Sequence, residues 1–136
     1  MASRWLLKTE PGEYSFDDLV RDRTTVWDGV RNPLALRYLR AIRKRDELLI
    51  YHTGTVRAVM GLARAATDPY PDPAQQDPKL VVVDVVPVRR LPQLVSLEAM
   101  KAERAFRGFE LVRLPRLSVM PVPVAFWSLI LRMAGR

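Results

Sequence analysis

The sequence contains no cysteine and a single histidine, His52. Without cysteine the chain can form no disulfide scaffold, thiolate nucleophile, zinc finger or iron–sulfur site. One histidine excludes metal sites built from several imidazoles. No apolar run approaches the ~20 residues that a membrane-spanning helix requires, and the N-terminal residues lack the charged and then apolar segments of a signal peptide. We therefore expect a cytoplasmic protein that uses no metal, cofactor or membrane.

Motifs of the common enzyme classes are absent as well. The six glycines never form GxGxxG or GxxxxGK[ST], and no GxSxG is present. The adjacent carboxylates Asp17–Asp18 and Asp46–Glu47 would point apart on a helix or strand, so they make poor acid–base pairs. His52 is then the one imidazole that could act as a base. The sequence predicts no catalytic site.

The charge of the chain is its most informative overall property. Twenty-two Lys and Arg residues oppose fifteen Asp and Glu residues, which gives a net charge of +7 on a chain of 136 residues. That length fits one domain, expected to span residues 1–136. A basic surplus favours a nucleic-acid partner, because contacts with phosphates release counterions. The alternative is that the charge only keeps the protein soluble.

Hydrophobic periodicity and turn signals predict a mixture of strands and helices. Strands are expected at residues 4–8, 25–27, 47–52, 57–66, 80–88 and 117–122, and helices at residues 16–21, 33–44, 97–105 and 123–134. Four prolines between residues 68 and 78 predict an exposed loop, and Pro121 places the last strand at a sheet edge. Several strands follow one another without an intervening helix. This order favours an α+β fold with a mainly antiparallel, curled sheet or small barrel rather than a doubly wound sheet.

Aromatic and polar side chains gather at the ends of the predicted strands. They include Trp27, Tyr51, His52 and Thr53 on or beside strands, and Lys8, Glu10, Asp28, Arg31 and Asn32 in the turns that follow. A planar base needs stacking surfaces and a few fixed donors and acceptors at its edge, and this set could supply both. Taken singly, a tryptophan in a strand is more often a core residue, and a lone histidine is more often a hydrogen-bonded turn residue.

A group of basic residues could bind a nucleic-acid backbone. Arg37, Arg40 and Lys44 fall on one face of the predicted helix 33–44, and Arg31 lies just before it. Phosphate contacts of this kind position a nucleic acid without reading its sequence. We expect these four residues to bind phosphates.

Four ordered strings of the sequence resemble the EVE domain family. They are Trp5–Leu19 (WLLKTEPGEYSFDDL), Val26–Asn32 (VWDGVRN), Leu49–Thr53 (LIYHT) and Arg116–Val122 (RLSVMPV). The resemblance covers nearly the whole chain. It implies a PUA-like fold, a small mixed, mainly antiparallel β-barrel flanked by helices. The segment Leu48–Ala63 is also similar to the strand pair of YTH domains, which cage N6-methyladenine between aromatic rings.

The resemblance also implies a function and a site. EVE domains are regarded as readers of modified bases, chiefly modified cytosines in DNA and also modified nucleotides in RNA. Transferred to matching positions, the family pattern makes Trp27 a stacking face, lines the pocket with Asn32, Tyr51, His52 and Thr53, places Lys8 and Glu10 at its mouth and adds Ser118.

Two departures from the family pattern fall near the expected pocket. After Asn32 the family usually continues Tyr-Gln-Ala-Arg-Asn, whereas this chain has Pro33-Leu-Ala-Leu-Arg37, and Met120 stands where many members have glutamine. The loss of these aromatic and polar groups predicts either an altered ligand preference or a weaker pocket.

These observations lead to one main hypothesis and two alternatives. The main hypothesis is a non-catalytic domain that binds DNA or RNA and accepts a modified cytosine or a methylated adenine into an aromatic-lined pocket. One alternative is an enzyme that processes a modified nucleotide with His52 or Glu10 as acid or base. The other is a protein-interaction or small-molecule-sensing domain with a vestigial pocket.

Overall fold

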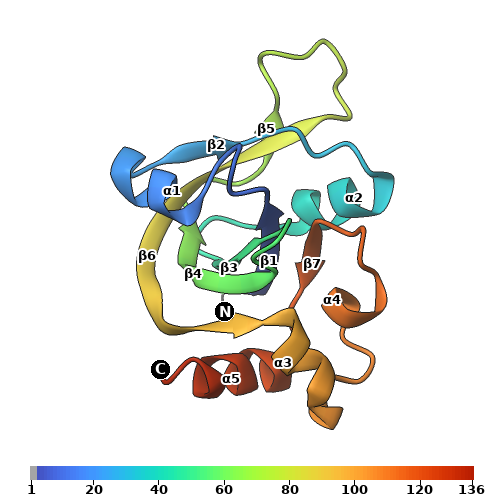
Figure 1. The fold of residues 1–136 in the computed structure, drawn as a ribbon. Coiled ribbons are helices and arrows are strands. Elements are labelled where there is room, and N and C mark those ends of the chain that lie inside the picture. Colours follow the sequence, from blue (N-terminus) through green and yellow to red (C-terminus); the bar gives the residue numbers. More distant parts are fainter. Residues whose placement is uncertain (1–2) are drawn as a thin grey trace.

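A strongly curled sheet with helices around it forms the protein (Figure 1). The structure is a computed structural model that describes residues 3–136. In chain order its elements are β1 (Arg4–Thr9), α1 (Phe16–Asp22), β2 (Thr25–Trp27), α2 (Pro33–Ala41), β3 (Glu47–His52), β4 (Ala58–Ala65), β5 (Tyr70–Pro71), β6 (Val81–Ser96), α3 (Leu97–Ala102), the 3-10 turn η1 (Arg104–Phe106), α4 (Glu110–Arg113), β7 (Val119–Pro121) and α5 (Val124–Met133). No helix within residues 3–136 is long and apolar enough to cross a membrane.

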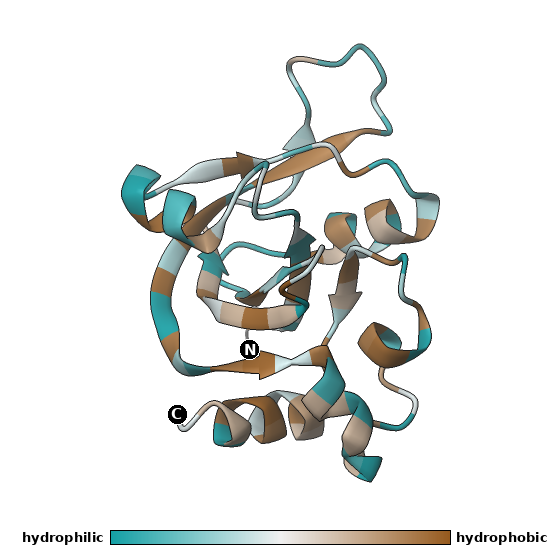
Figure 2. Cartoon of the chain, viewed as in Figure 1, coloured by the Kyte–Doolittle hydropathy of each residue, from teal (hydrophilic) through white to brown (hydrophobic). Residues whose placement is uncertain are grey.

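The sheet has the strand order β2-β6-β4-β3-β1-β7, and β5 pairs with β6. Only the β1–β3 pair is parallel among the strands of residues 3–136, and the other pairs are antiparallel. The prediction of an α+β fold with a mainly antiparallel, curled sheet and flanking helices is therefore confirmed. Strands β3 and β4 form an antiparallel hairpin, and β7 with Pro121 lies at the edge of the sheet, as predicted. Figure 2 shows hydrophobic residues, in brown, along both the strands and the helices.

Strand β6 is longer than predicted: the sequence pattern placed its end at Val88, and in the structure it continues to Ser96. Its ladder with β4 pairs Gly61 with Arg90 and Val59 with Val95, so residues 91–94 bulge out opposite Met60. A bulge bends a strand and tolerates a proline, here Pro92, that cannot donate to the ladder. In Figure 1 β6 accordingly sweeps around one side of the molecule as an arc.

Helix α2 is shorter than predicted and ends at Ala41, because Ile42 is already extended (ψ 144°). The buried carboxylate of Asp46 stabilises the turn that follows. It accepts hydrogen bonds from the backbone N–H of Arg43 (2.9 Å), the backbone N–H of Ser3 (2.9 Å) and the indole Nε1 of Trp5 (2.8 Å). One side chain thus ties the end of α2 to β1. The short α4 and η1 lacked the length for a clear periodic signal and were not predicted.

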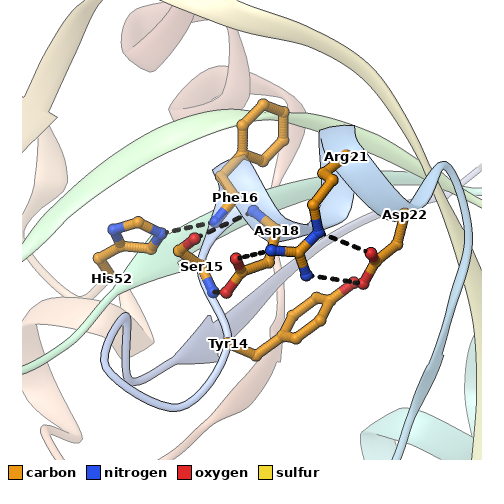
Figure 3. Close-up of polar contacts among 7 residues, drawn as sticks. All are labelled: Tyr14, Ser15, Phe16, Asp18, Arg21, Asp22 and His52. Carbon is orange, nitrogen blue, oxygen red and sulfur yellow. Dashed lines mark hydrogen bonds and ion pairs between the residues drawn. The ribbon is translucent and has the colours of Figure 1, made fainter.

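Helix α1 is docked on the β3–β4 hairpin by its first residue. The ring of Phe16 is buried and lies directly over Gly61 of β4, where a Cβ atom would overlap it. The backbone N–H of Phe16 donates a 3.0 Å hydrogen bond to Nε2 of the buried His52, at the end of β3 (Figure 3). An N–H at the start of a helix has no acceptor within the helix. His52 supplies the acceptor that the Phe16 N–H would otherwise lack.

A second set of contacts closes the same end of α1. Ser15 and Asp18 form a reciprocal capping box, with Ser15 Oγ accepting from the Asp18 N–H at 3.0 Å and Asp18 Oδ2 accepting from the Ser15 N–H at 2.9 Å. Arg21 bridges Asp18 and Asp22, and the hydroxyl of Tyr14 donates to Asp22 (Figure 3). The loop before α1 is thereby held in one conformation.

We expect Gly61→Ala to destabilise the protein by roughly 1–3 kcal/mol, because the added methyl group overpacks the site filled by the Phe16 ring. Urea unfolding followed by circular dichroism measures the change. The same substitution in a Phe16→Leu background, where the ring is gone, should have a much smaller effect. An equal loss in both backgrounds would contradict this account of the contact.

The burial of His52 makes stability depend on pH. Burial lowers the pKa of His52 below its ordinary 6.5, although Glu10, Asp17 and Asp18 favour its charged form. The unfolded chain therefore binds a proton more readily than the folded protein, so stability is fully present above pH 6.5 and falls as the pH drops through the lowered pKa.

A glutamine at position 52 keeps an acceptor for the Phe16 N–H but cannot titrate. We expect the free energy of unfolding of the wild-type protein to fall more than that of His52→Gln between pH 7.5 and pH 5 in matched urea titrations. Parallel pH profiles for the two proteins would show that His52 is not the titrating group.

Candidate functional site

A cavity of about 730 Å³ lies beside the end of β1. Three stretches of chain form it: the end of β1 with the loop before α1, strand β2 with the loop before α2, and one residue before β7. The lining residues are Lys8, Thr9, Glu10, Glu13, Tyr14, Thr25, Val26, Trp27, Asp28, Gly29, Val30, Arg31, Asn32 and Ser118. Seven of the residues singled out from the sequence are therefore brought together here, namely Lys8, Glu10, Trp27, Asp28, Arg31, Asn32 and Ser118.

Trp27 combines a core position with access to the cavity. It pairs in register with Val83 at the end of β2, and the residue is 8% exposed. Trp27 is therefore a core residue, as a tryptophan in a strand usually is. It is also one of the residues that line the cavity.

Asn32 has a structural role that leaves part of its side chain available. Its Oδ1 accepts hydrogen bonds from the N–H groups of Leu34 and Ala35, both at 3.0 Å, and so caps α2. The N–H groups of the Asn32 amide donate to no residue within 3–136. Its side chain can therefore present donors to a ligand while Oδ1 holds the helix.

Lys8 and Glu10 are both anchored at the cavity wall. Lys8 Nζ donates to the carbonyl of Pro115 at 3.0 Å and lies 5.5 Å from the ring centre of Tyr51. Burial lowers the pKa of Lys8. Glu10 Oε2 accepts from the N–H of Gly12 at 2.6 Å. Each charged group thus has a fixed place relative to the cavity.

The charges around the cavity do not match a phosphate site. Lys8 and Arg31 are basic, whereas Glu10, Glu13 and Asp28 are acidic. Among residues 3–136, Glu13 and Asp28 receive no side-chain hydrogen bond and join no ion pair. Both are exposed, so their carboxylates are free to accept hydrogen bonds from a bound molecule.

The other three predicted pocket residues do not line this cavity. Tyr51 and His52 are buried in β3, and Thr53 follows that strand with its N–H bonded to the carbonyl of Thr9 (2.9 Å). His52 is engaged with Phe16, as described above. The segment therefore stabilises the elements that form the cavity without lining it, because β3 pairs with β1 and His52 accepts a hydrogen bond from the start of α1.

The predicted basic stripe is only partly formed. Arg37 and Arg40 are exposed on α2, but Lys44 lies beyond the end of that helix, so the expected single face extending to Lys44 is wrong. Arg40 Nη2 also donates to the carbonyl of Lys79 at 2.6 Å. The helix ends early because the Asp46 carboxylate stabilises a turn at Arg43.

Several lining residues were not singled out from the sequence, among them the half-buried Tyr14 and the exposed Glu13. The family resemblance could have identified them, because every lining residue except Thr25 lies within one of three strings that carry it, namely Trp5–Leu19, Val26–Asn32 and Arg116–Val122. Thr25 directly precedes the second string. The residues at the two departures from the family pattern do not line the cavity. Met120 is fully buried in β7, and Leu34 is not a lining residue. The altered ligand preference or weaker pocket expected from the missing aromatic and polar groups stays a prediction.

Comparison with known proteins places these features in a family. The EVE domain family profile matches residues 3–133. Rat thymocyte nuclear protein 1 is 32% identical, with 72% of this chain and 55% of the relative covered, so the chain spans about half the length of the curated relatives it matches.

Solved structures agree closely with the fold. Protein Atu2648 from Agrobacterium tumefaciens superposes with a TM-score of 0.94 at 34% identity, covering 98% of this chain and 94% of that one. Human THYN1 in complex with 5-methylcytosine-containing DNA gives a TM-score of 0.91 at 27% identity, covering 99% of both chains. ASCH from Zymomonas mobilis, at 15% identity and a TM-score of 0.58, shares the fold alone. The chain therefore belongs to the EVE domain family and has its PUA-like fold.

Proposed function

We propose that this protein is a non-catalytic DNA-binding domain that holds a modified cytosine, flipped out of the duplex, in the cavity beside Trp27. The observation that carries the proposal is the cavity of about 730 Å³ with Trp27 among its lining residues and free hydrogen-bonding groups around it. The human relative THYN1, solved with 5-methylcytosine-containing DNA, supports the choice of polymer and base.

The energies of such a binding mode are consistent with this site. Flipping a base out of the stack costs a few kcal/mol. Stacking on an aromatic side chain contributes about 1–3 kcal/mol per base and offsets much of that cost. The indole of Trp27 and the half-buried ring of Tyr14 are the aromatic surfaces in the wall.

The free carboxylates favour a base that carries an amino group. Cytosine presents its N4 amino group as a donor, and Asp or Glu accepts from it, whereas thymine presents the acceptor O4 at the same place. Asp28 has no competing partner within residues 3–136, so its carboxylate can accept from that amino group. The Asn32 amide can donate to the base carbonyl. Methylated adenine, which also has an exocyclic amine, is the alternative base.

The structure gives less support to an enzyme. His52 is buried, accepts the N–H of Phe16 and does not line the cavity. Glu10 is held by the N–H of Gly12. Both residues that an acid–base mechanism would use are therefore engaged in structural hydrogen bonds. The open cavity also favours a binding domain over one with a vestigial pocket.

We expect Trp27→Leu to weaken binding of a duplex with one 5-methylcytosine by roughly 10- to 100-fold, because the stacking face is lost while an apolar side chain remains. Fluorescence anisotropy at fixed salt measures the affinity. Trp127→Leu is the matched control, since Trp127 is also a buried tryptophan, lies in α5 and does not line the cavity. Equal, weak binding of modified and unmodified duplexes by the wild-type protein would refute the proposed function.

We expect Asp28→Ala to reduce the preference for 5-methylcytosine over thymine at the same position by roughly 10-fold or more, because the acceptor for the N4 amino group is removed. The ratio of the two affinities is the readout, since loss of a negative charge strengthens binding of any DNA. Glu103→Ala makes the same charge change at an exposed residue outside the cavity and should leave the ratio unchanged.

A further inference from the structure

The cavity cannot by itself attract a DNA backbone, because its wall carries more acidic than basic side chains. Affinity for DNA comes largely from cations that contact phosphates. Such cations should lie outside the cavity but close to its mouth. Arg40, predicted for this role, is bonded to the Lys79 carbonyl, and Lys44 lies beyond α2.

Two hydrogen bonds from Lys8, a residue of the cavity wall, hold the segment between α4 and β7 in place. Lys8 donates through its backbone N–H to the carbonyl of Ser118 (2.9 Å) and through Nζ to the carbonyl of Pro115 (3.0 Å). Ser118 lines the cavity, and the exposed Arg116 lies between these two anchored residues. Its guanidinium therefore belongs to a turn held at the edge of the cavity.

Helices α2 and α4 meet next to this turn. The hydroxyl of Tyr38 on α2 donates to Glu110 Oε2 on α4 at 2.7 Å. Arg37 adjoins Tyr38 on α2, and Arg113 lies three residues after Glu110 on α4. The hydrogen bond therefore joins the parts of the two helices that carry these arginines. Figure 1 shows α2, β7 and α4 on the same side of the molecule, and α2 packs against β7.

These arginines have no acidic partner of their own. Arg37, Arg113 and Arg116 are exposed, and among residues 3–136 their side chains join no ion pair and donate no hydrogen bond. The nearby carboxylate of Glu110 is engaged by Tyr38. Three guanidiniums therefore face solvent beside the anchored cavity wall.

We propose that Arg37, Arg113 and Arg116 form a surface that binds the phosphates of a DNA strand and leads it across the seam between α2 and α4 to the cavity. The inference rests on the proposed function and adds the path of the DNA. Arg113 and Arg116 are new members of the site. The surface reads no base, so it contributes equally to modified and unmodified DNA.

The test is the double variant Arg113→Ala/Arg116→Ala, measured by anisotropy on matched duplexes with and without 5-methylcytosine over a range of salt concentrations. We expect affinity for both duplexes to fall by about 10-fold or more, with their ratio unchanged. The slope of log K against log salt should decrease in magnitude by roughly 2, about 1 for each lost phosphate contact.

The matched control is Arg132→Ala/Arg136→Ala, which removes two exposed cations from α5 and the C-terminus, at the end of the molecule away from the loop before α2 (Figure 1). Unchanged binding by the first variant, or an equal loss in both, would overturn the inference. A changed ratio of modified to unmodified binding, with the same salt slope, would also overturn it.

The two proposals fail in different ways. Loss of affinity in the first variant, without any preference of the wild-type protein for 5-methylcytosine, would support the phosphate surface and refute the base-binding function. The same variant tested on RNA of the same sequence distinguishes the polymers. Stronger dependence on Arg113 and Arg116 for RNA than for DNA would contradict the DNA path.

Discussion

The docking of Phe16 on Gly61 is the contact on which the candidate site depends. It fixes the start of α1 against the β3–β4 hairpin, and the hydrogen bond from the Phe16 N–H to His52 holds the same point from the strand end. The loop before α1 supplies Glu10, Glu13 and Tyr14 to the cavity wall. If α1 shifted, one side of the cavity would shift with it, so the shape of the cavity depends on this single close approach.

Acidic side chains line the cavity, where a base would be recognised, and exposed arginines lie outside it, where phosphates would be bound. Inside the cavity, Glu13 and Asp28 leave acceptors free, and such groups discriminate between bases by their exocyclic amines or carbonyls. Outside it, Arg37, Arg113 and Arg116 are exposed on the α2–α4 side. An acidic interior would repel the phosphates and leave the base as the part of the nucleotide that enters. Affinity and selectivity would then come from different residues.

Polar side chains that could bind a ligand also make hydrogen bonds that stabilise the fold. Asn32 shows that both uses can coexist, because Oδ1 caps α2 while the amide N–H groups stay free. His52 shows the opposite outcome, because its Nε2 must accept the Phe16 N–H in a buried place. A residue's type indicates what chemistry it can do, but the unsatisfied backbone groups nearby decide whether it is available.

The sequence by itself determined most strand positions, the α+β class and the family, because strand periodicity is local and the strings around Trp5, Trp27 and Ser118 are distinctive. Those strings also contain nearly the whole cavity wall. Only the tertiary structure decided that β6 continues past Pro92, that α2 ends before Lys44, and that the string around His52 supports the cavity without lining it. The reason is that each depends on a partner distant in the chain, namely β4 for β6, Ser3 and Trp5 for the Asp46 carboxylate that ends α2, and Phe16 for His52.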